Sequence, residues 1–188
     1  MKTRYSLLLA LVGMSRACLG QAPFNLLSLN VPGGTPTNLR PQYERVLGPV
    51  TSLGVRGAWY FGGAWPGWQL EAFGRCYTAE AAPRGLYLQY QVGYFRHHGL
   101  TVGLGPPPGF ELITKPLNVS SYGGGLGMGY QWLPGVGRHH LVLDAMAGFK
   151  LYLQPNSFRD EGAGYVGDWY TFGPGSIFNG RLGLGYAF

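Results

Sequence analysis

Apolar and polar residues alternate along most of this chain with the period of two that is typical of β-strands. The segment Arg181–Phe188 is a clear example, because Leu182, Leu184, Tyr186 and Phe188 alternate with small or charged residues. The segments with this pattern are Phe24–Val31, Leu39–Leu47, Leu53–Phe61, Trp68–Cys76, Leu86–Tyr94, Tyr122–Trp132, Leu141–Leu153 and Arg181–Phe188.

In the segment Leu141–Leu153 the charged residues fall on one face, opposite the leucines, and Arg40 and Glu44 of Leu39–Leu47 lie on the polar face of that segment. This distribution predicts an all-β fold, an eight-stranded antiparallel transmembrane β-barrel with an up-and-down meander, whose apolar face meets lipid. A lumen this narrow is filled by side chains, so we expect a network of interior salt bridges. The alternative is an ion path or a buried acid–base pair. The residues expected in the lumen are Arg40, Glu44, Arg56, Glu71, Arg75, Asp144, Lys150 and Arg181.

The connections between the segments alternate between short and long, as they do in outer-membrane barrels. Short periplasmic turns are predicted near Gly48–Val50, Ala79–Arg84 and Leu133–Arg138. Longer external loops are predicted at Pro32–Asn38, Gly62–Gly67, His97–Ser121 and Gln154–Ser176.

The start of the chain indicates export. Lys2 and Arg4 precede an apolar run that is too short to span a bilayer, and small residues follow near Gly20. We therefore expect a cleaved signal peptide at residues 1–20 and a barrel at residues 21–188. Removing Lys2, Arg4 and Arg16 lowers the formal charge from +6 to +3. No cluster of basic residues remains for nucleic acid.

The composition supports a lipid-facing barrel. Glycine accounts for 33 of the 188 residues, aromatic residues for 15%, and charged residues for only 12%, whereas soluble proteins contain about 25% charged residues. No run of apolar residues is long enough for a spanning helix. Aromatic residues expected at the membrane interfaces are Trp59, Tyr60, Trp65, Trp68, Tyr94, Trp132, Trp169 and Tyr170.

The C-terminal segment also predicts a partner. Outer-membrane barrels end in a strand with this alternation, and we interpret Leu184, Tyr186 and Phe188 as the signal that the barrel-assembly machinery binds. Outer-membrane lipid is the second expected partner. The predicted location is the cell outer membrane of a Gram-negative bacterium.

Several short motifs resemble a known family. They are Tyr43-Glu44-Arg45, Ser52-Leu53-Gly54, Gly74-Arg75-Cys76-Tyr77, Pro83-Arg84-Gly85-Leu86-Tyr87-Leu88 and the glycine-rich run from Gly123 to Trp132. Together they resemble an uncharacterised family of small outer-membrane proteins of Bacteroidetes-type bacteria, a domain of unknown function. The resemblance covers most of the mature chain and implies an OmpA-like eight-stranded barrel, without catalytic residues.

Histidines and serines supply candidate chemistry. The pairs His97-His98 and His139-His140 are expected at opposite ends of the barrel, so they cannot share one metal ion, and no metal or cofactor is predicted. A lipid-modifying enzyme would need a nucleophile, a base and an orienting carboxylate near the outer leaflet. The candidates are His97 or His98, with Ser120, Ser121 or Ser157, and Glu111, Asp160, Glu161 or Asp168.

One external loop is unusually aromatic. Tyr165, Trp169, Tyr170 and Phe172 form a possible contact surface for an unknown surface ligand, because Tyr and Trp dominate such sites. The alternative is a loop that folds over the barrel mouth. The sequence therefore predicts a non-enzymatic outer-membrane barrel with a plugged polar lumen, which acts structurally or through its two longest loops. The alternatives are an outer-leaflet lipid-modifying enzyme, a narrow pore, and a lipocalin-like barrel with its apolar faces inward.

Overall fold

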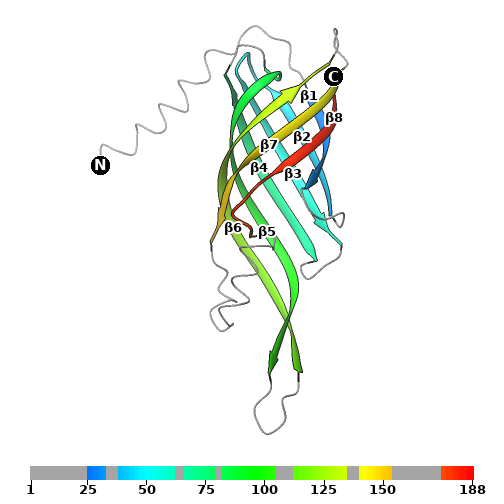
Figure 1. Cartoon of the computed structure of the whole chain (residues 1–188), viewed down its shortest axis with the longest axis vertical. Helices are drawn as coiled ribbons and strands as arrows, with labels where there is room; N and C mark the ends of the chain where they lie inside the picture. The colour runs from blue at the N-terminus through cyan, green and yellow to red at the C-terminus, as the bar shows by residue number, and fades with distance from the viewer. Residues whose placement is uncertain are drawn as a thin grey trace, which may run out of the picture.

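The chain forms a closed barrel of eight antiparallel strands (Figure 1). A computed structural model describes residues 25–32, 38–61, 66–78, 82–104, 112–134, 140–153 and 175–188. Each strand pairs with the next one along the chain, so the predicted all-β meander is confirmed. The strands are β1 (Asn25–Pro32), β2 (Asn38–Val46), β3 (Thr51–Tyr60), β4 (Gly67–Tyr77), β5 (Gly85–Leu104), β6 (Leu112–Trp132), β7 (His140–Tyr152) and β8 (Arg181–Ala187).

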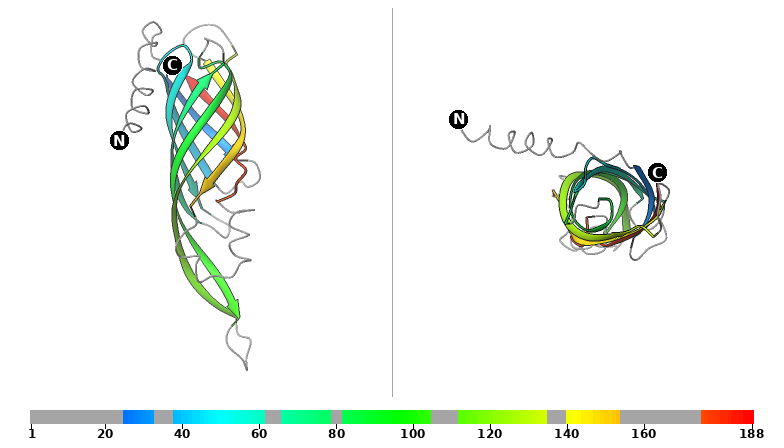
Figure 2. Two further views of the ribbon diagram at one scale, coloured as in Figure 1. Left: turned by 90° about the vertical axis from the view of Figure 1, so that its left-hand side faces the viewer. Right: turned by 90° about the horizontal axis from the view of Figure 1, so that it is seen from above.

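The barrel closes where β1 pairs with β8. Their register runs from Leu26 opposite Ala187 to Pro32 opposite Arg181. Next to this pairing, the backbone N–H groups of Asn25 and Phe188 each donate to the other residue's carbonyl oxygen at 2.9 Å. Seen along its axis the sheet is a complete ring (Figure 2). No strand within the ring therefore has an unpaired edge.

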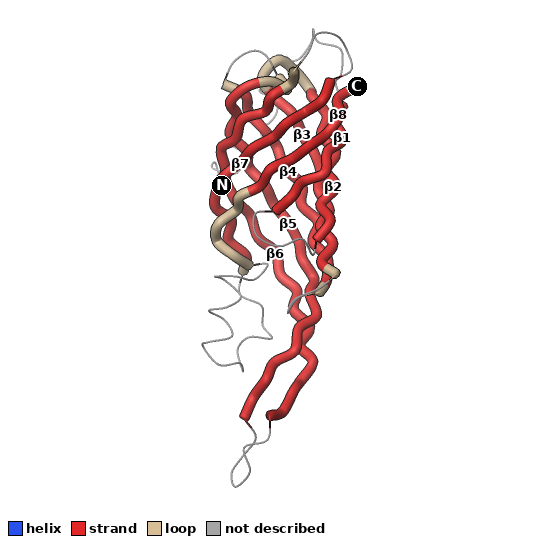
Figure 3. Tube along the Cα trace, turned by 45° about the vertical axis from the view of Figure 1, so that its right-hand side comes forward, coloured by secondary structure: helices blue, strands red, loops and turns tan. Residues whose placement is uncertain are grey.

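Two strands are much longer than predicted. β5 has 20 residues and β6 has 21, and they stay in one register from Gly85 opposite Gln131 to Leu104 opposite Leu112. Residues 98–104 and 112–118 project beyond the barrel as a two-stranded ribbon, which we call the ribbon (Figure 3). We call this end of the barrel the ribbon end, and the end that holds Asn25 and Phe188 the terminal end.

The prediction of an external loop at His97–Ser121 was therefore wrong for the residues that the structure describes. The alternation of apolar and polar residues breaks after Tyr94, where Phe95 and His97 are buried inside the ring and Arg96 is exposed on the outer wall. Beyond His97 the ribbon has no lumen side that could restore the alternation. Cross-strand backbone pairing holds it instead. The other six strands agree with the predicted segments to within two residues at each end.

Burial in this barrel is the reverse of burial in a soluble protein. Polar and charged side chains are enclosed in the lumen, among them Glu44, Arg56 and Arg75. Large apolar side chains such as Leu88 and Leu126 lie exposed on the outer wall. The lipocalin-like alternative, which places the apolar faces inward, is wrong for this chain. In the described residues, no helix is long and apolar enough to cross a membrane.

A small apolar cluster occupies the terminal end of the lumen. It includes side chains from both sides of the seam between β1 and β8, and it adjoins the charged residues, because Tyr77 and Tyr87 donate to Glu44 and Asp144. Its members are Leu26, Val46, Tyr77, Ala82, Tyr87, Leu133, Val142, Met146 and Ala187. The lumen is thus closed at one end by apolar packing.

Glycines on the inner face leave room for large side chains. A Cβ atom at Gly54 would lie 2.5 Å from the carbonyl oxygen of Tyr43 and would also overlap the Phe73 ring. A Cβ atom at Gly129 would overlap the ring of Tyr87 in the same way. The glycine content of the chain is therefore partly a packing requirement of a narrow lumen.

We predict that Gly54→Val destabilises the barrel by about 1–3 kcal/mol, because the new side chain overfills a packed position. Gly57→Val on the same strand is the matched control. A Cβ there approaches other atoms no closer than 3.9 Å, at Pro41. The free energy of unfolding in urea measures both effects, and equal losses for the two variants would contradict the packing explanation.

Candidate functional site

Arg75 is the centre of the lumen at the terminal end. Its guanidinium donates to Glu44 at 2.8 Å and to Asp144 at 2.5 Å, and both carboxylates are buried. The hydroxyl of Tyr77 donates to Glu44 at 3.0 Å, and that of Tyr87 donates to Asp144 at 2.5 Å. Contacts from one arginine on β4 to residues on β2 and β7 cross the lumen, so side chains fill it at this level.

Arg75 also lies against aromatic rings. Its guanidinium carbon is 4.2 Å from the centre of the Tyr87 ring and 5.1 Å from that of Phe73. Ring faces attract cations, most strongly where water is absent. Carboxylates, hydroxyls and rings together hold the charge of a side chain that is only 1% exposed.

A second cluster lies closer to the ribbon end. Arg56 pairs with Glu71 at 2.5 Å. Gln69 donates to Glu71 at 2.8 Å and also bonds to the hydroxyl of Tyr152, which in turn donates to Glu71 at 3.1 Å. Gln69 lies on β4 and Tyr152 on β7, so this cluster also crosses the barrel.

The remaining predicted lumen cations join these clusters through neutral groups. Arg40 donates to the hydroxyl of Tyr60 at 3.1 Å. Arg181 donates to the side-chain oxygen of Gln89. The ammonium of Lys150 lies 5.5 Å from the centre of the Tyr152 ring. Every predicted lumen residue thus lies on the inner side of the wall, and the ion pairs described above join Arg56 to Glu71 and Arg75 to Glu44 and Asp144.

Sequence reasoning missed the neutral members of this network. Gln89 donates to Gln91 at 2.9 Å and thereby connects the two clusters. The sequence pattern indicates their position, because these glutamines lie on the same face as the charged residues and alternate with outward-facing leucines and tyrosines. The neutral residues that complete the network are Gln42, Gln69, Gln89, Gln91, Gln131, Tyr77, Tyr87 and Tyr152.

The candidate catalytic residues are dispersed. His97, expected in a loop, is fully buried at the ribbon end of the lumen, with its ring 4.7 Å from that of Tyr60. His98 is exposed on the opposite face of β5, beside Asn118. The hydroxyl of Ser121 donates to the backbone carbonyl of Leu153 at 2.5 Å. Ser120 is exposed on β6. The other candidates lie outside the described residues, and they are Ser157, Glu111, Asp160, Glu161 and Asp168.

The described histidines lie at opposite ends of the barrel. His97 is at the ribbon end, whereas His140 begins β7 at the terminal end, opposite Ala187. His139 lies outside the described residues. Within the described ranges, no group of three His, Cys, Asp or Glu side chains could hold a metal ion.

Aromatic residues gather on the outer wall near both ends. At the ribbon end, the ring of Tyr94 lies 5.3 Å from Trp68 and 4.8 Å from Tyr122. Trp132 is exposed near the terminal end. Tyr60, expected in this belt, instead faces the lumen, where its hydroxyl donates to Gln69 at 2.9 Å. Trp65, Trp169 and Tyr170 lie outside the described residues, as do Tyr165 and Phe172 of the predicted contact surface.

The C-terminal residues Leu184, Tyr186 and Phe188 all point outward. The rings of Tyr186 and Phe188 are nearly parallel, with their centres 6.3 Å apart. Residues 1–24, which include the predicted signal peptide, lie outside the described residues.

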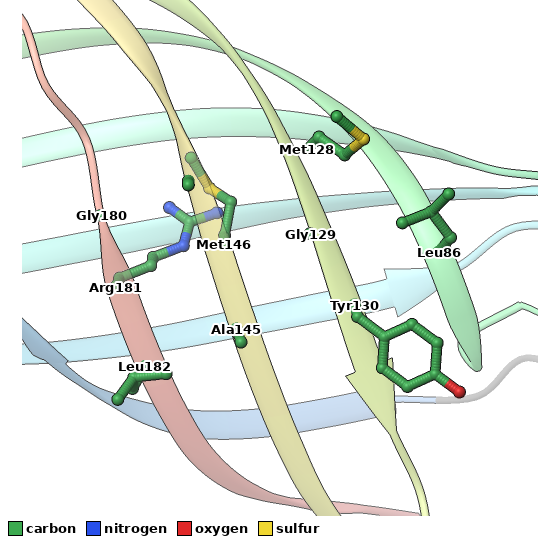
Figure 4. A pocket seen from close by; sticks show the side chains of 10 residues that line it. Leu86, Met128, Gly129, Tyr130, Ala145, Met146, Gly180, Arg181 and Leu182 are labelled. Atoms are coloured by element: carbon green, nitrogen blue, oxygen red, sulfur yellow. The ribbon is translucent and has the colours of Figure 1, made fainter.

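A groove of about 610 Å³ lies on the outer wall near β6, β7 and β8 (Figure 4). Ala145 and Ala147 have small side chains, whereas Met128, Tyr130 and Leu182 are larger and stand around them. The groove is a continuation of the apolar outer surface. It does not reach the ion pairs of the lumen.

Comparisons with known proteins leave the family open. No family model matches the chain, and no curated protein matches it. Among solved structures, it is similar to the N-terminal β-barrel domain of Pseudomonas aeruginosa OprF, with a TM-score of 0.45 and 10% identity over 90% of this chain and 99% of that one. The resemblance to the family of small outer-membrane proteins therefore stays a prediction.

We predict that Arg75→Met destabilises the barrel by about 3–5 kcal/mol, because it leaves two buried carboxylates without a cation. Arg45→Met is the control, since Arg45 is exposed on the outer face of β2. Adding Glu44→Gln and Asp144→Asn to Arg75→Met is expected to restore much of the loss. Urea unfolding of the four proteins tests this. If the triple variant is no more stable than Arg75→Met, unpaired charge is not the cause.

Proposed function

We propose that this chain is a small outer-membrane β-barrel protein with a closed lumen, which displays the ribbon and the connections at the same end to the outside of the cell. The observation that carries the proposal is the inverted burial: charges and glutamines fill the interior, and leucines and aromatic residues cover the outer wall. A wall of this kind is stable in hydrocarbon and prone to aggregation in water.

The aromatic residues support the same location. Trp and Tyr favour the boundary between hydrocarbon and water, and in transmembrane barrels they form a girdle at each boundary. Trp68, Tyr94 and Tyr122 would form part of the outer girdle, and Trp132 and Tyr186 part of the inner one. Leu184, Tyr186 and Phe188 would bind the barrel-assembly machinery before insertion.

The filled lumen favours a structural or recognition role over transport. Two clusters of side chains bridge opposite walls, and the apolar cluster adjoins one of them. An ion would have to break buried pairs to pass. We propose that the protein is neither a pore nor an enzyme, since Ser121 and His98 make local contacts that do not align them for nucleophilic attack.

Recognition falls to the ribbon, because one of its edges is suited to pairing with another chain. β4 pairs with β5 as far as His97, and the N–H of His98 donates to Pro66 at 2.8 Å. Tyr60 pairs with Gly67, so the described pairing of β3 and β4 ends at this level. The N–H and C=O groups of successive residues alternate between the two sides of a strand. Leu100, Val102 and Leu104 therefore direct these groups away from β6, toward the side on which β4 pairs with β5 within the barrel.

The other edge of the ribbon is interrupted. The carbonyl of Tyr122 accepts from Leu153 on the β7 side, and the same alternation puts Pro116 on that side. Proline has no N–H, and prolines on edge strands prevent pairing with further strands. We therefore propose that an extended polypeptide segment adds to the edge of β5, continuing the line of hydrogen bonds that β4 makes with the same strand.

Membrane insertion predicts that the cost of a charge depends on depth. Leu126 and Leu153 are 70% and 71% exposed, but Leu126 lies midway along the wall and Leu153 lies just beyond β7 at the ribbon end. Leu126→Arg is expected to destabilise the barrel in lipid vesicles by about 2–4 kcal/mol, and Leu153→Arg by about 0–1 kcal/mol. In a water-soluble barrel, two side chains with equal exposure would give similar values.

Reversible unfolding in urea from lipid vesicles measures this difference, and fractionation of cells that produce the full chain places the protein. Equal costs for the two variants, together with recovery of the parent in the soluble fraction, would contradict the membrane location. Either result leaves the lumen network as described.

Strand addition predicts that one backbone N–H on the ribbon matters. Val102→Pro removes an N–H that points away from β6, so the ribbon itself keeps its pairing. Peptides that bind the parent are first selected from a display library of short random peptides. We expect their affinity for the Val102→Pro variant to be about tenfold weaker, because one backbone hydrogen bond is blocked and its neighbours are disturbed. Thr114→Pro is the matched control, on the edge that Pro116 already interrupts. Equal binding to the Val102→Pro variant and the parent would contradict this mode of recognition.

A further inference from the structure

Three buried donor nitrogens on the inner face near β8 have no acceptor. They are Nδ2 of Asn179 and the Nε and Nη1 atoms of Arg181. Asn179 is 8% exposed and Arg181 is 4% exposed, so bulk water does not solvate them. The third guanidinium nitrogen of Arg181, Nη2, bonds to Gln89. Leaving buried donors unsatisfied costs free energy, and the cost is larger for a charged group.

Asn179 and Arg181 share one face of one extended segment. The backbone N–H of Asn179 donates to Gly148, Phe178 pairs with Phe149, and Arg181 pairs with Met146. These pairs share one register with β7, so residues 178–180 extend β8 along β7. Residues two apart on such a segment point the same way. Phe178 and Leu182, which flank this stretch on either side, are exposed on the outer wall, which places Asn179 and Arg181 inside.

The surroundings of these donors are short of negative charge. The lumen holds the cations Arg40, Arg56, Arg75, Lys150 and Arg181 against the carboxylates Glu44, Glu71 and Asp144.

All three carboxylates already pair with Arg56 or Arg75, and among the described residues none lies within 4.0 Å of Arg181. Lys150 adds a further cation on the adjacent strand, where its backbone N–H donates to Ile177. The buried charge of Arg181 has no carboxylate partner among the described residues, which is costly, and a counter-ion would remove that cost.

The groove on the wall described above reaches these residues, because Met146, Gly180 and Arg181 are among the residues that line it. Figure 4 shows the Arg181 side chain beside Met146, between β8 and the neighbouring wall. A buried acceptor without a donor, Oδ1 of Asn30, lies against Gly183 on the β1 side of β8.

We propose that the lumen binds a small inorganic anion of halide size between the amide of Asn179 and the guanidinium of Arg181. Three buried donors on one face of one segment lack acceptors, the three lumen carboxylates pair with Arg56 or Arg75, and the lumen residues carry more positive than negative charge. The anion would complete the lumen as a buried counter-ion. This site is independent of the proposed membrane location, because it depends only on the interior of the barrel.

Bromide is the probe, because it substitutes for chloride and is located by anomalous diffraction. Crystals of the full chain grown with bromide are expected to show an anomalous peak within hydrogen-bond reach of Arg181 Nη1 and Asn179 Nδ2. In solution, replacing gluconate with bromide or chloride at constant ionic strength is expected to raise the midpoint of heat denaturation by about 3–6 °C for each tenfold rise above the dissociation constant.

Arg181→Gln is expected to remove both the peak and the halide response, and Asn179→Leu to weaken them. Arg96→Gln is the matched control, since Arg96 is exposed on the outer face of β5, and it should keep both. If Arg181→Gln does not fold, the peak in the parent and the Asn179→Leu variant still decide the matter. A parent without a peak or halide response would overturn the proposal, as would a response that Arg181→Gln leaves unchanged.

Discussion

The buried pairing of Arg75 with Glu44 and Asp144 is the interaction on which the interior depends. An eight-stranded barrel with an apolar outer wall must place its polar groups inside, where each needs a partner because little water is present. Arg75 satisfies two carboxylates from opposite walls, and those carboxylates accept from Tyr77 and Tyr87. The polar filling therefore also ties the walls together, with β2, β4, β5 and β7 joined through a few atoms.

Space in the lumen is divided between very large and very small residues. The ring of Phe73 lies beside Gly54, and the ring of Tyr87 lies beside Gly129. Because these rings also lie against Arg75, the glycines indirectly position the central cation. Packing and electrostatics are thus the same constraint here, and a methyl group at either glycine would disturb both.

Much of the fold could be predicted from the sequence, because a barrel wall in contact with two different environments gives each strand an alternating pattern. The same reasoning placed Arg56, Glu71 and Arg75 on the inner face, where the structure has them. It failed where that physical cause is absent. The pattern breaks after Tyr94, where an aromatic residue and a histidine face the lumen and Arg96 faces outward, and the ribbon beyond has no lumen side, although the strand continues to Leu104. The partners of each charge depend on how β4 faces β7 across the ring, which no local pattern encodes.

The seam between β1 and β8 has a consequence for biogenesis. The first and last strands of the described sheet are neighbours, so the ring cannot close until β8 has been delivered. Any intermediate that lacks β8 has two edge strands with unpaired backbone N–H and C=O groups, one of them β1, and these edges can pair with other chains. Loss of β8 alone would therefore leave an aggregation-prone open sheet in place of a smaller barrel.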